Sequence, residues 1–541
     1  MALSLTAEQK SIIKIFKIEE QYVVPSYQRP YSWEYDHCFQ LFTDLMRAYD
    51  SKEDYFIGNI IIAKSDSNTE FVEVVDGQQR LMTLLLLIKV LSLFQEDFKV
   101  LNDLLSKEDW KGINREPRIR TEIFESNDDQ ALNNVLNYTK EDFERLLANS
   151  LDRNGKIVER KIRDKFAINS LYLYQWIEFF TKKGDLEKFT YYFLQQIYLL
   201  PIELGGKTQE EANEKALVIF ETINNRGMNL EDADIFKAKL YNKAKKVNEE
   251  LIFIDLWTEF KSNCSELDLM IDDVFRYYSH IIRGREGITL GEKNLREFFI
   301  NENYSPFELK QYKDILNDLF KILEILEFIK QSRINSSRIS PWLQVIDLYT
   351  NQYPKFAIVN FLFVNGLNVT DDFNIFLKSL IRFVYYQGST ATIKFEIYNI
   401  IKQTSQKLQI SRYYKEDIKE DYFNYLGRLK KGFALLAYHL RYDTSKTYEV
   451  IDRIINLGDK KLLGQDWEDV DFKYFLDSIS NYLVIDFPKK NLPLDKKMTY
   501  YLSEGIDEVA TIVRNGYRFS DFTKREHMLK QVLIDFFNGQ N

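Results

Sequence analysis

The 541-residue sequence contains little glycine, proline or cysteine. With 20 glycines and 9 prolines, it lacks the composition of long disordered or linker segments. Its two cysteines, Cys38 and Cys264, cannot form a disulfide framework or, by themselves, a zinc site. The small number of cysteines fits a reducing cytoplasm. The many Leu, Ile, Phe, Lys and Glu residues favour a mainly helical protein.

The sequence also lacks recognisable targeting and membrane-spanning segments. Residues 1–10 have no basic region followed by an apolar core, so we expect no secretory signal. The most apolar stretch, residues 81–94, is interrupted by Lys89 and is too short to cross a bilayer, which predicts a buried helix and no membrane association. The net charge of −9 excludes a protein coated in positive charge, but it permits a local basic groove for DNA.

The length predicts several domains, because a single core rarely extends over so long a chain. We expect an α+β protein that is predominantly helical. A small α/β domain is predicted for residues 1–130, followed by a helical extension over residues 131–250 and a helical scaffold over residues 251–440. Residues 441–541 are expected to form a separate C-terminal domain.

The first domain contains a strand–turn–helix motif. Residues 18–25 are predicted to form a short strand that ends at a proline, and residues 56–63 and 70–75 to form the two strands of a hairpin. The second hairpin strand continues into residues 76–80, with the sequence DGQQR, and an apolar helix begins near Leu81. The sequence therefore predicts that DGQQR forms a tight turn at the start of a buried helix.

A turn of this kind can bind an anion. The first N–H groups of a helix have no intrahelical partner, and the helix dipole favours negative charge there. Gly77 permits a close approach of the backbone, and Arg80 offers a planar fork to phosphate oxygens. Gln78 and Gln79 can bond to phosphate, water or a base, while Asp76 can bind Mg²⁺ through water or cap the helix. The alternative for an isolated pentapeptide is a capping aspartate and a surface arginine.

The pentapeptide is accompanied by other segments in a fixed order. These are residues 25–33 (PSYQRPYSW), 56–60 (FIGNI) and 75–84 (VDGQQRLMTL). Together they resemble the N-terminal domain of the GmrSD-like restriction proteins, which is similar to the ParB/sulfiredoxin-like nucleotide-binding fold. The resemblance implies binding and hydrolysis of a nucleoside triphosphate with Mg²⁺, coupled to recognition of modified phage DNA. It leaves open whether the nucleotide is GTP, ATP, CTP or UTP.

The resemblance also implies roles for single residues. The candidate catalytic side chains are Asp76, Gln78, Gln79 and Arg80. Asp76 is in addition the candidate metal ligand, through water. The candidate nucleotide-binding residues are Gln28, Arg29, Gly77, Thr83, Asn224 and Arg226.

The aromatic segment over residues 27–33 has two interpretations. Its rings can pack between the first strand and the following helix. They can also line a cup that, with Gln28 and Arg29, receives a base, a sugar or a modified backbone group. The candidate residues for sensing DNA or its modification are Tyr27, Tyr31 and Trp33.

A second motif lies within residues 216–230. Gly227 suits the left-handed position at a helix C-terminus, and Asn229 can cap the next helix, so a helix–turn–helix corner explains both. That corner does not explain Asn224 and Arg226. The GmrSD-like proteins have a similar signature here, a helix that ends in Asn-x-Arg-Gly, which implies that these two residues complete the nucleotide pocket.

The C-terminal part resembles an HNH nuclease domain, with its ββα fold, in a degenerate form. Residues 451–456 (IDRIIN), 479–484 (ISNYLV) and 490–491 (KN) follow the order of the HNH elements. Arg453 stands where the general-base histidine is expected, and arginine cannot deprotonate in a protein. The degenerate motif comprises Asp452, Arg453, Asn481 and Asn491.

None of the four histidines of the chain, His37, His280, His439 and His527, falls within this motif. The lysines near it can hold a phosphate backbone or form a solvated face, and the sequence favours neither. We therefore expect a nuclease-like fold without its standard catalytic base.

Three functional hypotheses follow. The first is a cytoplasmic, anti-phage restriction-type protein that binds and hydrolyses a nucleoside triphosphate and senses DNA, with an inactive nuclease domain. The second is a nucleotide-gated, non-enzymatic DNA-binding scaffold or regulator that works with a separate effector protein. The third is an active NTP-dependent DNA endonuclease with an unrecognised base. The sequence leaves open whether the protein forms a homo-oligomer.

Overall fold

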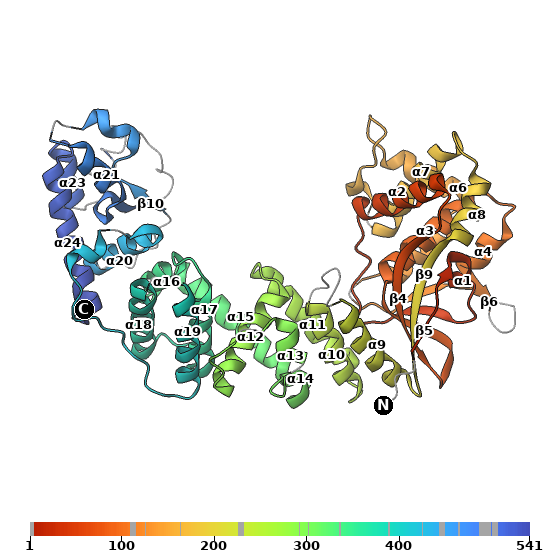
Figure 1. The fold of residues 1–541 in the computed structure, drawn as a ribbon, viewed down its shortest axis with the longest axis horizontal. Helices are drawn as coiled ribbons and strands as arrows, with labels where there is room; N and C mark the ends of the chain where they lie inside the picture. The colour runs from red at the N-terminus through yellow and green to blue at the C-terminus, as the bar shows by residue number, and fades with distance from the viewer. Residues whose placement is uncertain are drawn as a thin grey trace. The chain divides into compact units, whose positions relative to one another are not determined.

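The computed structural model divides into two compact units, Met1–Ile254 and Asp255–Asn541 (Figure 1). Within the described residues the protein is predominantly helical, with a mixed sheet in the first unit, which confirms the α+β, mainly helical fold expected from the sequence. The structure describes residues 5–108, 115–124, 126–162, 164–224, 232–291, 293–300, 302–334, 337–387, 390–424, 426–442, 450–463, 466–485, 499 and 507–540.

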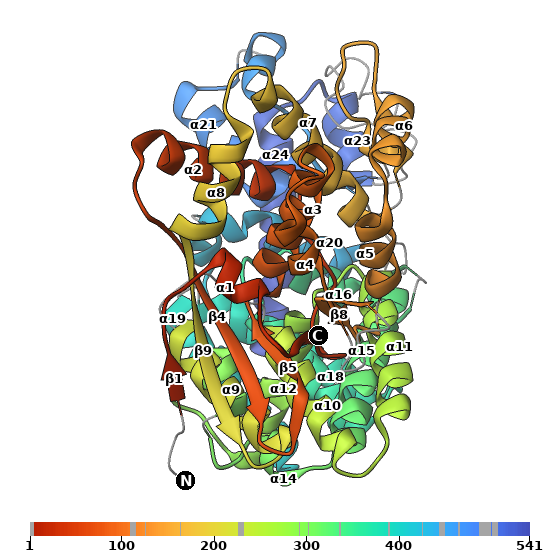
Figure 2. The same ribbon diagram turned by 90° about the vertical axis from the view of Figure 1, so that its right-hand side faces the viewer.

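A seven-stranded mixed sheet organises the first unit (Figure 2). Its strand order is β1-β9-β4-β5-β3-β8, and β2 also pairs with β9. β4 and β5 form the antiparallel hairpin that the sequence predicts, whereas β3 lies parallel to β5 and β8, and β4 lies parallel to β9. The strands are β1 (Leu5–Ala7), β2 (Lys10–Ser11), β3 (Gln21–Val24), β4 (Tyr55–Ser65), β5 (Asn68–Asp76), β8 (Ile119–Thr121) and β9 (Ile197–Gly206).

The helices of this unit form where apolar residues recur at helical spacing behind a cap. Thr139 and Asp142 make a capping box at the start of one helix, and the Asp164 and Asp185 side chains accept from backbone N–H groups at the start of two others. The helices are α1 (Ile12–Phe16), α2 (Tyr35–Ser51), α3 (Gln78–Phe94), α4 (Lys99–Leu105), α5 (Asp128–Asn137), α6 (Lys140–Ser150), α7 (Lys165–Thr181), α8 (Leu186–Gln196), α9 (Gln209–Asn224) and α10 (Asp232–Lys245). A two-stranded sheet of β6 (Ser106–Glu108) and β7 (Arg115–Pro117) lies apart from the main sheet.

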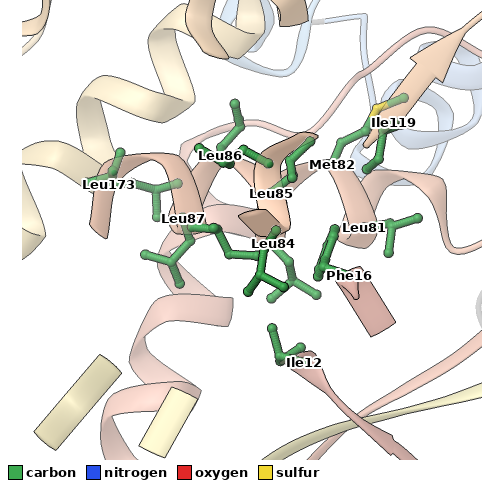
Figure 3. Packing of buried hydrophobic residues seen from close by; sticks show 14 of the residues in the cluster. Ile12, Phe16, Leu81, Met82, Leu84, Leu85, Leu86, Leu87, Ile119 and Leu173 are labelled. Atoms are coloured by element: carbon green, nitrogen blue, oxygen red, sulfur yellow. The ribbon is translucent and has the colours of Figure 1, made fainter. Parts of the chain in front are cut away.

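Helix α3 lies at the centre of the hydrophobic core. All of its residues from Leu81 to Leu93 are buried. Phe16 of α1 and Leu173 of α7 belong to the same cluster, and Figure 3 shows them beside the leucines of this helix. A helix that is apolar on all sides must be covered on all sides, so the buried helix predicted over residues 81–94 is confirmed.

Strand β9 departs from the sequence prediction. Residues 131–250 were expected to form a helical extension, but β9 lies within them and pairs with β4 over its whole length. The segment was difficult to recognise because Pro201 interrupts its apolar pattern, and proline is rare in central strands. On the far side of β9, β2 pairs with residues 198–199 and β1 with residues 202–204, so Pro201 lies between the two segments that pair with this edge.

The second unit is built mainly from helices, namely α11 (Glu250–Glu266, which begins in the first unit), α12 (Ile271–Glu286), α13 (Leu295–Ile300), α14 (Pro306–Leu309), α15 (Tyr312–Ile334), α16 (Ser340–Asp347), α17 (Tyr353–Asn365), α18 (Asp371–Gln387), α19 (Thr390–Ser405), α20 (Lys430–Tyr442), α21 (Asp469–Asp477), α23 (Asp507–Arg514) and α24 (Phe519–Asn538). β10 (Val450–Arg453) and β11 (Tyr482–Ile485) form an antiparallel pair. Helix α24 packs beside this pair, where Arg525 donates to the carbonyl oxygens of Ser480 and Tyr482.

Two general properties of the chain follow from burial and helix length. In the part of the chain that the structure describes, no helix combines the length and the apolar character needed to cross a bilayer. Cys38 and Cys264 are buried free thiols, and burial raises the pKa of each to about 12. A thiol that stays protonated at neutral pH is a poor nucleophile, so neither cysteine is poised for catalysis.

Candidate functional site

The turn between β5 and α3 consists of Gly77 alone. Gly77 adopts φ 86° and ψ 8°, in the left-handed region, and is the N-cap residue of α3. A Cβ atom at this position would lie 2.5 Å from Cγ2 of Ile60 and 3.2 Å from the carbonyl oxygen of Asn59. The backbone conformation and the close approach of β4 therefore both require glycine here.

Gln78 and Gln79 tie this turn to the segment that follows β3. Gln78 Nε2 donates to the carbonyl oxygen of Arg29 at 3.1 Å, and Gln79 Nε2 donates to that of Pro30 at 3.0 Å. Gln79 Oε1 in turn accepts from the Ser32 N–H at 2.8 Å. Both glutamines are buried, but Gln78 Oε1 has no hydrogen-bond partner among the described residues. Both polar atoms of the Gln79 side chain thus take part in hydrogen bonds within the domain. The side-chain oxygen of Gln78 remains able to accept a hydrogen bond from another group.

Arg80 reaches from α3 to β4. Its Nη1 donates to the carbonyl oxygen of Asn59 at 2.9 Å. A Cβ atom at Gly58, which has φ 135°, would lie 2.6 Å from the same Nη1. The glycine therefore provides the space that the guanidinium occupies. Arg80 is partly exposed, and arginine has five donors, so the side chain retains N–H groups for an anion.

Asp76 is the acidic residue of the turn, and it precedes the N-cap residue instead of serving as the cap. Burial raises the pKa of its carboxyl group, while the positive charges of Arg80 and Arg29 act in the opposite direction. Gln28 Nε2 donates to the carbonyl oxygen of Val75 at 3.0 Å. The structure therefore brings Gln28 and Arg29 to the end of β5, beside the turn that carries Asp76 and Arg80.

Tyr31 is the centre of a buried polar network. Its hydroxyl contacts Thr83 Oγ1 at 2.7 Å and accepts from Asn169 Nδ2 at 3.0 Å, and its N–H donates to Asp128 at 2.6 Å. Its ring stacks on Phe166 with centroids 4.3 Å apart. Tyr31 and Thr83 are thus held by the fold, and they fix the aromatic segment against α3, α5 and α7.

The other two aromatic candidates differ in exposure. Trp33 is partly exposed, and its carbonyl oxygen accepts from Asn169 Nδ2 at 2.9 Å. Tyr27 is buried against Tyr241 of α10, with ring centroids 5.8 Å apart, and its hydroxyl has no hydrogen-bond partner among the described residues. Packing and hydrogen bonds within the domain therefore explain Tyr31. Packing explains the ring of Tyr27 but not its hydroxyl group, while Trp33 presents part of its side chain to solvent.

The sequence of this whole region matches one known family. Residues 12–241 match the family model described as the GmrSD restriction endonuclease, N-terminal domain. Residues 12–241 therefore form a GmrSD-type N-terminal domain. The matched segment contains the β5–α3 turn and the aromatic segment that it binds, and the family is one of restriction-type, anti-phage proteins. A search of curated proteins found no match.

The GmrSD N-terminal domain has a second polar cluster on the side of the sheet that faces α9. Asn213 Nδ2 donates to Glu73 Oε2 at 2.7 Å, and Gln209 Nε2 donates to Asn213 Oδ1 at 3.1 Å. Glu73 and Asn213 are buried, and the charge of Glu73 acts on the hydroxyl of Tyr27. Sequence reasoning missed this cluster. The available signal was Glu73 itself, a charged residue between the apolar pairs at residues 71–72 and 74–75.

The second sequence motif of the GmrSD domain lies at the C-terminal end of α9. Asn224 is the last residue of this helix, and Arg226 lies outside the described residues, as does the predicted corner at residues 227–229. Their expected part in a nucleotide pocket stays a prediction. Lys237 of α10 is a further buried cation that the sequence did not single out, and its Nζ lies 4.5 Å from the centre of the Phe124 ring.

The donors around the turn are compatible with Mg²⁺ that arrives together with a nucleotide. Among the described residues, no cluster of three or more His, Cys, Asp or Glu side chains is arranged to hold a metal ion. Mg²⁺ is usually bound by one or two carboxylates together with substrate phosphates and water. Asp76 supplies one carboxylate of that kind, so the phosphates would have to provide the other ligands.

Three residues of the motif that the sequence predicted in the C-terminal region take part in contacts within the second unit. Asp452 and Arg453 end strand β10, where Asp452 is buried and Arg453 Nη2 lies 3.1 Å from Asp477 Oδ1. Asn481 is fully buried, accepts from the Ile455 N–H at 2.9 Å and donates to its carbonyl oxygen at 3.0 Å. Asn491 lies outside the described residues. The structure therefore brings Asp452, Arg453 and Asn481 to one strand pair.

Proposed function

We propose that the GmrSD N-terminal domain binds a nucleoside triphosphate with Mg²⁺ at the β5–α3 turn and hydrolyses it. The observation that carries this proposal is the convergence of Arg80, Arg29 and Asp76 at the N-terminal end of α3. The two arginines come from segments far apart in the sequence, and the hydrogen bonds of Gln78 and Gln79 hold those segments together.

We place the phosphate groups of the nucleotide at the N-terminal end of α3. The first N–H groups of α3 have no intrahelical acceptor, and the positive end of the helix dipole lies at the same point. Arg80 adds a guanidinium whose donors are only partly used, and Arg29 is exposed and free to turn toward a ligand.

The open acceptor of Gln78 gives the ligand a second point of contact. A buried polar atom without a partner costs free energy, so it is a natural site for a donor on a bound molecule or an ordered water. A ribose hydroxyl, a base amino group or the attacking water can each supply that donor. The fixed position of Gln78, set by its bond to Arg29, would orient the group that it binds.

Asp76 is suited to position water during hydrolysis. Burial raises the pKa of its carboxyl group, which makes the carboxylate a better proton acceptor than an exposed aspartate. Bound Mg²⁺ would neutralise charge that develops on the phosphates. Arg80 and Arg29 would stabilise the same charge from the protein side, and their positive charges oppose the rise in the pKa of Asp76 that burial causes.

An Arg80→Ala variant tests the assignment. We expect loss of nucleotide binding, measured by calorimetry with each of the four triphosphates and Mg²⁺, and loss of phosphate release, with an unchanged circular dichroism spectrum. Arg120→Ala is the matched control, because Arg120 lies in the same domain and is half exposed in a pair with Glu122. Wild-type binding by Arg80→Ala would refute the site. Binding by the wild type without phosphate release would favour the nucleotide-gated scaffold.

We further propose that the nucleotide cycle is coupled to sensing of DNA and that the C-terminal region does not cleave it. Arg453 is paired with Asp477 and carries a fixed positive charge beside Asp452, so it can neither act as a base nor attract a metal ion. The test is a plasmid-nicking assay with Mg²⁺ or Mn²⁺. Cleavage by the wild type that Asp452→Asn removes would overturn this part.

A further inference from the structure

The second unit contains a cavity of about 540 Å³ that none of the sequence motifs explains. It lies between the ends of α17, α18 and α19 and the segment that follows α19. Phe361 and Phe376 form part of its wall, with ring centroids 4.4 Å apart. Amide and hydroxyl side chains complete it, including Asn365, Asn368, Thr370 and Gln409. The volume lies within the usual range for small-ligand sites.

Cations and aromatic rings alternate along the face of α18 beside this cavity. Lys378 Nζ lies 5.0 Å from the centre of the Trp342 ring. The guanidinium of Arg382 lies 4.8 Å from the Tyr414 ring, and Arg412, which also lines the cavity, contacts the Tyr414 hydroxyl at 3.4 Å. The cavity and the cationic face are therefore continuous through Arg412.

The charge of this face is only partly compensated. The contact with Arg412 lowers the pKa of Tyr414, and Arg382 and Lys378 act in the same direction. Burial lowers the pKa of Lys378, and the neighbouring Arg382 lowers it further. Two acidic side chains lie near these cations. Asp372 lines the cavity, and Asp371 pairs with Arg338. The cations of the face and cavity outnumber them.

We propose that this cavity receives one nucleotide of a single-stranded or everted nucleic-acid segment. Its apolar lip, formed by the exposed Ile375 and Leu408, contacts the base, and the amide side chains of the wall bond to the base edge. Arg412, Lys407 and Lys378 hold the adjacent phosphates. Lys407 and Arg412 line the cavity, whereas Lys378 lies on α18 outside its lining, so the three cations match a strand with several phosphates better than a mononucleotide.

The proposal refines the DNA sensing proposed above, but it does not depend on the β5–α3 site. Binding is measured by fluorescence anisotropy with a labelled thymidine oligonucleotide of about 20 units and an abasic analogue of the same length. Both probes are titrated over a range of salt concentrations without added nucleotide. The Arg80→Ala protein is included, and it should bind both probes like the wild type.

The first variant removes the phosphate contacts. Arg412→Gln/Lys407→Asn neutralises two cations, and asparagine tolerates the left-handed backbone of Lys407, which has φ 54°. We expect the affinity for both probes to fall roughly tenfold and the salt dependence to lose about two phosphate contacts. The control Lys419→Gln/Lys431→Gln removes two exposed cations outside the cavity lining. It should leave the salt dependence close to that of the wild type.

The second variant fills the cavity. Asn368→Trp places a large ring at an exposed position of the lining. It should weaken binding of the thymidine probe several-fold without changing its salt dependence, and it should leave the abasic probe unaffected. The proposal fails if the wild type binds neither probe, if the control pair weakens binding as much as the first variant, or if Asn368→Trp affects both probes equally. Loss of nucleotide binding in Arg80→Ala with retained oligonucleotide binding confirms that the two sites are separate.

Discussion

The β5–α3 turn of the first unit and the β10–β11 pair of the second both concentrate polar motif residues, but they use them differently. Asn481 is fully buried and bonds to both backbone groups of Ile455. Gln78 makes one bond, to Arg29, and keeps a buried oxygen without a partner. We therefore infer a ligand contact for Gln78, because one of its buried polar atoms has no hydrogen-bond partner within the described fold, and we infer none for Asn481.

The arginines of the two regions show the same contrast. Arg453 Nη2 lies 3.1 Å from the carboxylate of Asp477, which also pairs with Lys430, so the arginine already has a counter-ion within the fold. Arg80 donates instead to the neutral carbonyl oxygen of Asn59, and its charge acts on Asp76 from a distance. We conclude that the first region is arranged to attract an anion, whereas the second is arranged to hold its own strands together.

Replacing Asn481 should have the largest effect on stability. Asn481→Ala leaves two buried backbone groups without partners, so we expect a loss of roughly 3 to 4 kcal/mol in the free energy of unfolding of the second unit. Urea unfolding with hydrogen-exchange readout of peptides around residues 450–485 measures it. Asn317→Ala is the control, since Asn317 is exposed on α15 and its replacement should cost about 0.5 kcal/mol. A similar loss for both variants would remove the contrast between the regions.

Replacing Gly77 should destabilise the first unit by roughly 2 to 3 kcal/mol. Alanine there meets both a left-handed backbone and the Ile60 side chain at 2.5 Å. Gly155→Ala separates the two causes, because Gly155 has φ 78° but open space around its Cβ position, which should cost about 1 kcal/mol. Equal losses in the two variants, measured by urea unfolding, would show that β4 does not crowd the turn.

Replacing either of the two neighbouring glutamines should lower the stability of the first unit, but to different extents. Gln79→Ala removes bonds to Pro30 and Ser32 and should cost about 2 kcal/mol, whereas Gln78→Ala removes one bond and should cost about 1 kcal/mol. Nucleotide calorimetry should rank them in the reverse order, with the greater loss of affinity for Gln78→Ala. If the two rankings agree instead, the open oxygen of Gln78 has no part in binding.

The smallest expected effect is a gain in stability from Asp76→Asn. Burial raises the pKa of Asp76 above its ordinary value of 3.8, so proton binding favours the folded state. The resulting contribution to stability is complete below the ordinary pKa and is lost as the pH rises through the raised pKa. Asparagine carries no such penalty, so the variant should melt above the wild type at pH 7, and the difference should shrink toward pH 3. A variant that melts lower at neutral pH would show that the ion pairing of Asp76 outweighs its burial.

The sequence predicted the elements around the turn because their signals are local. The hairpin follows from two apolar runs, the buried helix from a long apolar segment in which Lys89 is the one charged residue, and the glycine of the turn from its place between them. The contacts of Gln78 and Gln79 could not be predicted in the same way. Which carbonyl oxygen a side chain meets depends on how distant segments pack, and the sequence carries no direct signal for it.

The pairing of β9 and the polar cluster at Glu73 were missed for a related reason. Pro201 breaks the alternation that identifies a strand, and only the sheet shows that this residue lies between the two segments that pair with the far edge of β9. Glu73 is paired with Asn213, which comes from a helix much later in the chain. The cavity in the second unit is likewise formed by the ends of three helices that carry no shared motif.

The parallel pairing of β4 with β9 also sets the order in which the first unit can form during synthesis. Residue 61 pairs with residue 202, so the apolar β4 has no partner on that side until α8 and β9 have left the ribosome. Meanwhile the hairpin and α3 are complete, and their apolar edge is exposed to other chains. A nascent chain that stalls before β9 is therefore expected to aggregate through this edge.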